Sequence, residues 1–560
     1  MPGPTPLTRT PAPSLDFSVP GTPTAEDFGD IYFSADGGLD EARAVFLTGC
    51  GLPQRWMERD VFTIAELGFG SGLNFLATLQ AWRDSGARGR LHYISVEGFP
   101  FDRDDLHRAL SQFPELSDLA ASLIEQWPGP VRGIHRRHFG SVTLTLVHDA
   151  VTPALTSQTF RADAWFLDGF SPAKNADMWS PKILAEVARL SAPGGRVATF
   201  TVAGDVRRGL SDAGFTVSRE PGFGSKRQRL EAVMPGEPPA PTAPPLPTII
   251  GAGIAGASIA RAFLRRGLRP AVISDPNHVA ASGNGAALIK PRFDLQDNPA
   301  SRFFLSSFLY ARHAYGDAIR HEGVLHLNKS AKERDRHQRL IDQDVLGRGH
   351  IKMSDKDVYL GSSLVIDTEA ARQSFLSGIT VESRRVETID AIDGPVILAS
   401  GYGIRTLLPD AAFRFSRGQL SWATGAVPQP VTYGGYVIPI RGDLLLGATH
   451  ERIEDHDKAF DLTETDDAKN FGQAQAQGLS VGPNVRPHRA SVRVNSPDTL
   501  PRLTQLKTQK AGQDMWVLSG LGSRGFVFAP LLGEALVSAY LGEPSPLDQK
   551  FLRRISRLPV

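Results

Sequence analysis

The sequence contains very little cysteine: Cys50 is the only one among 560 residues. A single cysteine excludes an internal disulfide framework, and it excludes a zinc or iron–sulfur centre built from several cysteines. Cys50 itself is best explained as a small buried residue. We therefore expect no metal site in this chain.

The sequence also lacks an excess of either charge and any long apolar run. Lys and Arg number 61 against 60 Asp and Glu, for a net charge of +1. A chain so close to neutral has no overall attraction to nucleic acid, so such binding would need a local patch. Residues 1–23 lack the apolar segment of a signal peptide, and no stretch reaches the roughly 18 apolar residues that cross a bilayer. We expect a cytoplasmic monomer that does not bind a membrane.

Prolines are concentrated at residues 235–247, which predicts an extended linker. The chain is too long for a single core, because cores rarely exceed roughly 250–300 residues. The linker therefore predicts two domains, at residues 1–234 and 248–560.

Both predicted domains alternate strand-like and helical segments, which indicates the α/β class. In the first domain the predicted strands are Thr63–Leu67, Leu91–Val96, Thr143–His148, Ala164–Leu167 and Arg196–Thr201. Amphipathic segments such as Leu73–Arg83 lie between them. This alternation predicts a parallel, doubly wound sheet of the Rossmann-like type. The second domain opens with a strand, a glycine turn and a helix, and its middle predicts a mixed sheet.

The first glycine-rich turn follows the strand that ends near Leu67 and carries Gly68, Gly70 and Gly72. Such a turn lets a ligand approach the backbone closely. Glu66 lies beside it and is suited to a ligand's ammonium group, and no lysine of a phosphate-binding loop is present. Glu97 and Asp149 end the next two strands, where carboxylates accept from ribose hydroxyls and from an adenine amino group. S-adenosylmethionine fits this set.

The segment Asp163–Trp179 contains the candidate catalytic acid. Asp168 ends the fourth strand at the sheet edge where the methyl group would lie. A carboxylate there can orient an attacking amine and accept its proton. Phe170 and Trp179 could stack on a base, although packing in the core explains these rings equally well.

A second glycine-rich turn, with Gly251, Gly253 and Gly256, follows Pro247–Ile250. Its spacing is that of a dinucleotide-binding turn, with a pyrophosphate at the N-terminus of the next helix. Asp275 ends the next strand, close to the roughly 20-residue offset of a ribose-binding acid. The spacing alone leaves FAD and NAD open.

Three later segments favour FAD, because they resemble flavin oxidases of the D-amino-acid-oxidase type. They contain the candidate FAD contacts Ser282, Gly283, Asn284, Gly401, Gly522, Ser523, Arg524 and Gly525. The last four precede a helix whose positive N-terminus would face the flavin and stabilise its reduced, anionic form.

Four blocks of the first domain carry a more specific resemblance: residues 22–34, 66–74, 163–179 and 222–227. They are similar to the methyltransferase half of the bifunctional tRNA 5-methylaminomethyl-2-thiouridine biosynthesis family. The resemblance implies methyl transfer from S-adenosylmethionine to an aminomethyl group on a wobble uridine in the tRNA anticodon. It also implies a cofactor contact from Asn74 and substrate contacts from Lys174, Lys226 and Arg227.

The same family has an oxidase as its second half, which implies FAD-dependent removal of a carboxymethyl group from the aminomethyl nitrogen before methylation. Arg493 is our candidate for binding the substrate carboxylate, because a guanidinium binds it in a bidentate manner. Tyr436 is our candidate for a wall that positions the reacting C–H bond. A surface ion pair for Arg493 and core packing for Tyr436 remain as alternatives. The chain departs from the oxidase pattern at residues 359–363, where it has no tryptophan.

Two further basic clusters, at residues 132–138 and at Arg261 to Arg269, are better explained as solvated faces than as tRNA contacts. Two other functions stay open. One is a methyltransferase fused to an oxidase of free glycine or sarcosine. The other is a tRNA-binding scaffold with a degenerate oxidase half.

Overall fold

The computed structural model describes residues 9–19, 22–33, 37–224, 226–237, 244–347, 349–453, 455–484, 486–507 and 513–559. These residues form two units. The N-terminal unit combines residues 9–237 with Gly542–Gln549, and the C-terminal unit combines Pro244–Leu541 with the chain from Lys550 onward. The placement of Gly542–Gln549 with the N-terminal unit was not expected. The predicted linker lies partly outside the described residues, at 238–243, so the domain boundaries stay a prediction.

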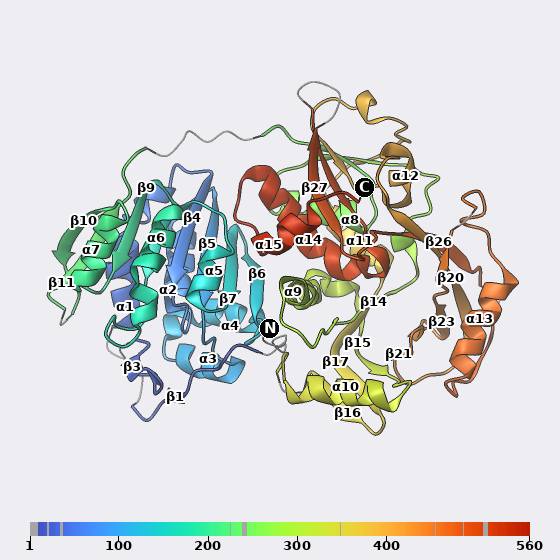
Figure 1. Cartoon of the computed structure of the whole chain (residues 1–560), viewed down its shortest axis with the longest axis horizontal. Helices are drawn as coiled ribbons and strands as arrows, with labels where there is room; N and C mark the ends of the chain where they lie inside the picture. Colours follow the sequence, from blue (N-terminus) through green and yellow to red (C-terminus); the bar gives the residue numbers. More distant parts are fainter. Residues whose placement is uncertain are drawn as a thin grey trace, which may run out of the picture. The chain divides into compact units, whose positions relative to one another are not determined.

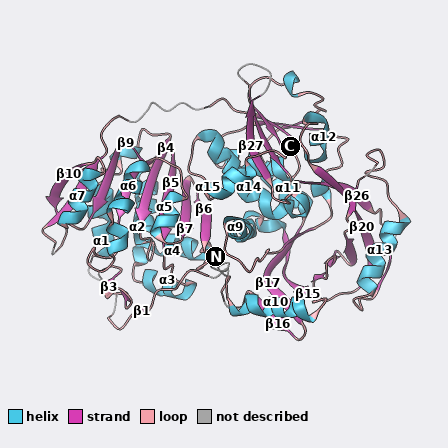
Figure 2. Ribbon diagram, viewed as in Figure 1, coloured by secondary structure: helices cyan, strands magenta, loops and turns pink. Residues whose placement is uncertain are grey.

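The sheet of the N-terminal unit has, within its described part, eight strands in the order β10-β11-β9-β8-β4-β5-β7-β6 (Figures 1 and 2). These strands are β4 (Val61–Leu67), β5 (Arg90–Glu97), β6 (Gly133–Phe139), β7 (Val142–His148), β8 (Ala162–Leu167), β9 (Ser191–Thr199), β10 (Thr216–Pro221) and β11 (Gln228–Val233). The strands β4, β5, β7, β8 and β9 are parallel, which confirms the predicted doubly wound sheet. Strands β6, β10 and β11 are antiparallel to their neighbours.

Helices cover both faces of this sheet. Successive residues of each strand point to opposite faces, and apolar residues on both faces need a covering layer. In β4, Ile64 belongs to the core that includes α2 (Leu73–Ser85), and Leu67 belongs to the core that includes α6 (Pro181–Arg189). The strand order reverses at β4, which lies between β5 and β8. Ligands of such sheets bind beyond the carboxyl ends of the strands at this reversal. The smaller elements of the unit are β1 (Leu15–Asp16), β2 (Thr24–Ala25), β3 (Asp30–Ile31), α1 (Gly38–Glu41), α3 (Arg103–Leu110), α4 (Ser117–Glu125), α5 (Val151–Thr156) and α7 (Gly204–Asp212).

The C-terminal unit contains a sheet with the order β18-β13-β12-β19-β28-β27 in its described residues. The strands are β12 (Thr248–Ile250), β13 (Ala271–Ser274), β18 (Val381–Ser383), β19 (Val396–Leu398), β27 (Arg502–Lys507) and β28 (Asp514–Ser519). Strand β12 is parallel to both of its neighbours and leads through the glycine turn into α8 (Ile254–Leu264). The predicted strand, turn and helix are therefore confirmed.

A second, mixed sheet of the C-terminal unit positions the candidate substrate residues. Its main path is β14-β17-β15-β21-β22-β23-β20-β24, with β16, β25 and β26 paired to its sides. The strands are β14 (Ala287–Ile289), β15 (Ile319–His326), β16 (Ile351–Ser354), β17 (Asp357–Ile366), β20 (Arg414–Gly425), β21 (Val431–Thr432), β22 (Tyr436–Ile440), β23 (Asp443–Gly447), β24 (Glu451–Arg452), β25 (Val481–Pro483) and β26 (Arg489–Asn495). Helix α10 (Ala331–Asp342) lies beside β16 and β17, and α13 (Glu464–Gln475) lies beside β20 (Figure 1).

Helix α14 (Gly525–Leu541) packs against α8 in the core of the C-terminal unit. The two backbones come close, since a Cβ at Gly533 would lie 2.8 Å from the carbonyl oxygen of Ser258. By length and composition the stretch Gly522–Leu541 could cross a membrane, so the expectation that no stretch is this apolar is wrong here. Its window is 67% buried inside the protein, as in the core helix of a folded domain. The other helices of the unit are α9 (Pro299–Ala314), α11 (Thr368–Leu376), α12 (Ile404–Leu407) and α15 (Gln549–Ile555).

Candidate cofactor and substrate sites

The first glycine turn lies directly after β4, at the reversal of strand order. Gly68 has a φ of +88°, and a Cβ there would lie 2.6 Å from the carbonyl oxygen of Asp168. Only glycine therefore allows this turn to approach the end of β8 so closely. Gly70 continues the turn beside the ring of Tyr32, and Gly72 precedes the first residue of α2. The turn thus has the cradle that S-adenosylmethionine requires.

The side chain of Asn74, in the first turn of α2, joins the two acids of this site. Its Nδ2 donates to Glu66 Oε1 at 3.0 Å and to Asp168 Oδ2 at 2.6 Å. Glu66 is 1% exposed and also accepts from Ser95 Oγ at 2.7 Å. One amide therefore holds both carboxyl groups in a fixed relation to the glycine turn.

Both acids titrate near neutral pH. Burial raises the pKa of Glu66 to about 8, against the opposing effect of the hydrogen bonds from Ser95 and Asn74. Burial also raises the pKa of Asp168 to about 7, while the Asn74 hydrogen bond acts in the opposite direction. Weaker effects on Asp168 come from the charges of Glu41, which raises its pKa, and Lys226, which lowers it. A carboxyl group with such a pKa is suited to accept a proton near pH 7.

Glu97 and Asp149 lie at the carboxyl ends of β5 and β7, as predicted. Glu97 is 9% exposed, and its two oxygens accept from the backbone N–H groups of Gly70 and Phe99, each at 2.8 Å. These bonds orient the carboxylate and leave further lone pairs for ribose hydroxyls. Asp149 accepts from the N–H of Ala150 at 3.0 Å, and its carboxylate lies 3.8 Å from Arg132. Both positions fit the proposed contacts to an adenosine group.

The two aromatic candidates differ in their environment. Phe170 is partly exposed and stacks on Phe28 with ring centroids 4.7 Å apart, and it meets Tyr32 edge to face at 5.1 Å. Trp179 is 6% exposed, belongs to the core beside α6, and donates its Nε1 hydrogen to the carbonyl of Phe170 at 2.8 Å. The packing alternative therefore describes Trp179 best, and Phe170 keeps the candidate role. The stacking ring of Phe28 was not predicted from the sequence, and Tyr32 had no predicted role.

The candidate substrate cations lie on two loops near Asp168. Lys174 lies 3.4 Å from Asp30 Oδ1, and Lys226 lies 2.6 Å from Glu41 Oε1 and 4.4 Å from the centroid of the Phe200 ring. Arg227 is exposed and has no ion-pair partner among the described residues. Each of these three side chains is at least partly exposed, and Lys226 acts electrostatically on Asp168 itself.

The second glycine turn, after β12, fits a dinucleotide. Gly251 has a φ of +110°, and a Cβ there would lie 2.4 Å from the carbonyl oxygen of Ala399. Gly253 immediately precedes α8, and Gly256 lies against the backbone of Gly251 in its first turn. The N-terminus of α8 therefore lies at a turn whose backbone segments approach closely, which is the geometry of a dinucleotide-binding turn.

The loop after β13 lies against this turn. Ser282 Oγ accepts from the N–H of Ile254 at 3.1 Å, and Asn284 Oδ1 accepts from Arg489 at 2.6 Å. Gly283 faces the same guanidinium, since a Cβ there would lie 2.8 Å from it. Asp275 follows β13 and accepts from the N–H of Asn277 at 2.9 Å. Of these four residues, Ser282 contacts the dinucleotide turn directly, and Gly283 and Asn284 follow it in the chain beside Arg489.

The remaining candidate FAD contacts lie at the ends of β19 and β28. Gly401 follows β19, next to Ser400, whose buried hydroxyl has no hydrogen-bond partner in the described residues. Such an orphaned hydroxyl fits a site completed by a polar cofactor. The candidates Gly522, Ser523, Arg524 and Gly525 form the turn that leads into α14.

Arg493 and Tyr436 come together from β26 and β22. Burial raises the pKa of Tyr436 to about 12, and the nearby charge of Arg493 acts in the opposite direction. The Arg493 guanidinium donates to the carbonyl of Thr449 at 3.3 Å and has no acidic partner among the residues that the structure describes. A Cβ at Gly418 would lie 2.6 Å from this guanidinium and 2.6 Å from the backbone carbonyl oxygen of Thr449, so glycine is needed there. An unpaired, half-buried guanidinium beside a tyrosine is suited to a substrate carboxylate.

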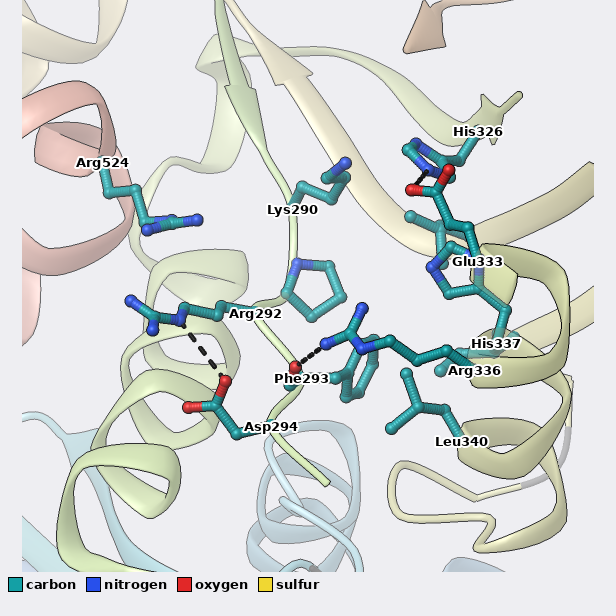
Figure 3. A pocket seen from close by; sticks show the side chains of 13 residues that line it. Lys290, Arg292, Phe293, Asp294, His326, Glu333, Arg336, His337, Leu340 and Arg524 are labelled. Atoms are coloured by element: carbon teal, nitrogen blue, oxygen red, sulfur yellow. Dashed lines mark hydrogen bonds and ion pairs between the residues drawn. The ribbon is translucent and has the colours of Figure 1, made fainter. Parts of the chain in front are cut away.

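A cavity of about 530 Å³ adjoins the turn before α14 (Figure 3). Its wall contains Arg524 together with residues for which no role was predicted from the sequence, most of them polar or charged. They are Lys290, Arg292, Asp294, His326, Glu333, Arg336 and His337. Part of this site could have been found in the sequence, because Glu333 and His337 are four residues apart on α10. The other residues of the cavity wall come from distant segments, so the sequence does not show that they meet.

The other basic clusters are structural. In β6, Arg136 is 0% and Arg137 is 3% exposed, and Arg136 donates to the carbonyl of Pro544. Directly after α8, Arg265 and Arg266 pair with the buried Glu534 at 2.9 and 3.0 Å. The interpretation as solvated faces is therefore wrong for Arg136, Arg137 and Arg266, which are buried with internal partners, whereas Arg269 is exposed.

A family of S-adenosyl-L-methionine-dependent methyltransferases matches residues 114–235, and a family of FAD dependent oxidoreductases matches residues 248–375 and 360–539. The chain is 42% identical to the tRNA 5-methylaminomethyl-2-thiouridine biosynthesis bifunctional protein MnmC of Caulobacter sp. (strain K31), over 94% of each chain. It is 41% identical to the protein of that name from Maricaulis maris, over 96% of this chain and 94% of that one. Among solved structures it resembles iminodiacetate oxidase from Chelativorans sp. BNC1, with 18% identity, a TM-score of 0.46, and coverage of 55% of this chain and 98% of that one.

Proposed function

The chain belongs to the tRNA 5-methylaminomethyl-2-thiouridine biosynthesis bifunctional family, and on this premise we propose which residues carry out its two reactions. Its cofactors are FAD and S-adenosyl-L-methionine. The oxidoreductase removes the carboxymethyl group from 5-carboxymethylaminomethyl-(2-thio)uridine of tRNA. The methyltransferase then methylates the freed 5-aminomethyl group. We place both reactions in the cytoplasm, on the anticodon region of tRNA.

The observation that carries the methyltransferase assignment is the Glu66–Asn74–Asp168 chain of hydrogen bonds. Glu66 would face the ammonium group of the cofactor. Asp168 would accept the proton that the substrate amine loses as its nitrogen takes the methyl group. Asn74 is a positioning residue, because it fixes Asp168 relative to the glycine turn. Phe170 would stack on the uracil ring, and Lys174, Lys226 and Arg227 would contact RNA phosphates.

In the C-terminal unit we assign substrate binding to Arg493 and Tyr436. Arg493 would bind the carboxylate of the carboxymethyl group, and Tyr436 would hold the methylene carbon in place. When bound, FAD would supply a hydride acceptor for the carbon beside nitrogen, and hydrolysis of the C=N bond left on the substrate would free the amine and release the two-carbon fragment as glyoxylate. The turn from Gly522 to Gly525 would direct the N-terminus of α14 toward the flavin and favour the added negative charge.

Mass spectrometry of tRNA nucleosides tests this division of labour in cells that carry only a variant protein. We expect Asp168→Asn to accumulate 5-aminomethyl-uridine. Gly253→Asp would place a carboxylate near Ser282, where the pyrophosphate is proposed, and should accumulate the carboxymethylated form. The matched controls are Asp177→Asn, exposed on the short 3₁₀ helix Ala176–Trp179, and Gly472→Asp, exposed on α13 where a Cβ would meet no atom within 4 Å.

The two variants must stall at different nucleosides. If both accumulate the same nucleoside, the assignment of one reaction to each unit is wrong. Purified protein is also assayed with free sarcosine in the absence of tRNA. Rapid turnover of sarcosine, with unchanged wobble uridines in cells that lack the protein, would support the small-amine oxidase instead.

A further inference from the structure

Two histidines and a glutamate converge on one side of the cavity whose wall also contains Arg524. His326 ends β15, and Glu333 and His337 lie on α10 (Figure 3). One potential ligand atom from each residue lies within 4.8 Å of the other two. His326 Nε2 and Glu333 Oε1 are 3.1 Å apart. Two imidazole nitrogens and one carboxylate oxygen are the ligand types of zinc and of non-haem iron sites.

The start of α10 explains why Glu333 and His337 face the same way. Ser330 caps the helix by accepting from the N–H of Glu333 at 3.2 Å. Residues four apart then lie on one side of the helix. Glu333 is fixed further, because its Oε2 accepts from the N–H of Lys329 at 2.8 Å. The other oxygen is left to face His326.

Hydrogen bonds also orient both imidazole rings. Asn328 donates its amide hydrogen to the carbonyl of Lys356 at 2.9 Å, which directs its Oδ1 toward His337 Nδ1 at 2.6 Å. His337 Nδ1 must therefore donate, and its Nε2 carries a lone pair. The ring of His326 is held at Nδ1 by Thr432 Oγ1 at 2.9 Å. Partners of this kind hold metal-binding histidines in the correct orientation.

We propose that His326, Glu333 and His337 bind a divalent transition-metal ion, with the remaining coordination positions open to the cavity. A simple hydrogen bond between His326 and Glu333 would explain that pair. It does not explain His337, whose Nε2 has no hydrogen-bond partner within the described residues. The proposal departs from our expectation of no metal site, which considered cysteine only.

The charge around the site sets its chemistry. Lys290 and Arg336 line the same cavity (Figure 3) and repel a metal cation. Arg336 is partly engaged, since it donates to the carbonyl of Phe293. The open coordination positions of the metal should therefore take an anionic oxygen ligand, because Lys290 and Arg336 would bind the same anion. Affinity for the bare metal should rise when one of these charges is removed.

Cobalt(II) is the probe, because its visible absorption reports coordination by nitrogen and oxygen ligands. Flavin-loaded, full-length protein without an affinity tag is stripped of metal by a chelator and titrated with Co²⁺. We expect one equivalent to bind with micromolar or tighter affinity and to be displaced by Zn²⁺. His337→Gln and Glu333→Gln should each weaken binding at least tenfold. His321→Gln, on the same strand as His326 but outside the triad, is the matched control.

Lys290→Gln should tighten Co²⁺ binding, because it removes a repelling charge without touching a ligand. Circular dichroism and thermal unfolding in the absence of metal establish that each variant is folded. Failure of the unaltered protein to bind Co²⁺ overturns the proposal by itself. Full binding in the Glu333→Gln, His337→Gln double variant overturns it too, as does unchanged affinity in Lys290→Gln.

Discussion

Binding of S-adenosylhomocysteine to the glycine turn after β4 should release a proton at pH 7. This product keeps the ammonium group of the cofactor and does not react. Burial holds the pKa of Glu66 at about 8 before the ligand binds, so most of the carboxyl is protonated at pH 7. An ammonium group beside it favours the carboxylate and lowers that pKa. Binding must therefore expel the proton.

The size of the effect follows from the titration of Glu66. With a pKa of about 8, the ionised fraction is roughly 1% at pH 6, 10% at pH 7 and 50% at pH 8. Affinity should rise about tenfold between pH 6 and pH 7, because only the ionised form binds the ammonium well. About 0.9 proton should leave at pH 7. Above pH ~8 the ligand's own amine loses its proton, and affinity should fall again.

Isothermal titration calorimetry in buffers of different ionisation enthalpy measures both quantities. Glu66→Gln keeps the shape of the side chain and removes the titration. We expect weaker binding and the loss of most of the proton release, with only the smaller pH dependence that the neighbouring Asp168 carboxyl contributes. Asp149→Asn removes an acid proposed to contact adenine, so it should weaken binding and preserve proton release. A Glu66→Gln profile that matches the unaltered protein would refute the placement of the ammonium group.

The remaining predictions concern the substrate. Arg493→Gln should raise KM for carboxymethylated tRNA about 10–100-fold, since a charged hydrogen bond is worth about 1.5–3 kcal/mol. The FAD content should stay unchanged. Steady-state kinetics measures KM, and absorbance at the flavin band measures the FAD content. Lys226→Gln and Arg227→Gln should each reduce the slope of log Kd for tRNA against log salt concentration by about 1. The control Arg137→Gln removes a buried guanidinium, so it should lower Tm without changing that slope. Equal slopes in all three variants would contradict the assignment of Lys226 and Arg227 to the tRNA-binding surface. The pH profile of kcat/KM for methylation should bend near pH 7, because burial raises the pKa of Asp168 to about 7. Asp168→Asn should remove the bend and lower the rate about 10²–10⁴-fold. If the bend persists in Asp168→Asn, it belongs to another group.

The parallel sheets and their glycine turns could be predicted, because each depends on a short local pattern. β4 and its turn occupy adjacent residues, and the acid Glu97 lies at the end of the next strand. The antiparallel edge strand β6 was not predicted, since its residues Gly133–Phe139 read as a basic cluster. The bridging role of Asn74 was also not predicted. It depends on Asp168, which is 94 residues away and meets Asn74 only because β8 lies beside β4.

Charge clusters in the sequence gave the least reliable guide to function, and the reason is physical. A guanidinium can be buried if distant segments supply acceptors, and those acceptors are invisible in a local window. Arg266 is buried against Glu534, 268 residues away, whereas Arg227 is exposed. The histidines of the cavity present the converse case. His337 lies in a polar stretch that resembles an ordinary solvated helix, and His326 ends a strand between two leucines. Thr432, from β21, holds the ring of His326, and Asn328 holds the ring of His337. Local sequence therefore identifies turns that bind a cofactor backbone, whereas sites assembled from side chains of several elements become visible only in the folded chain.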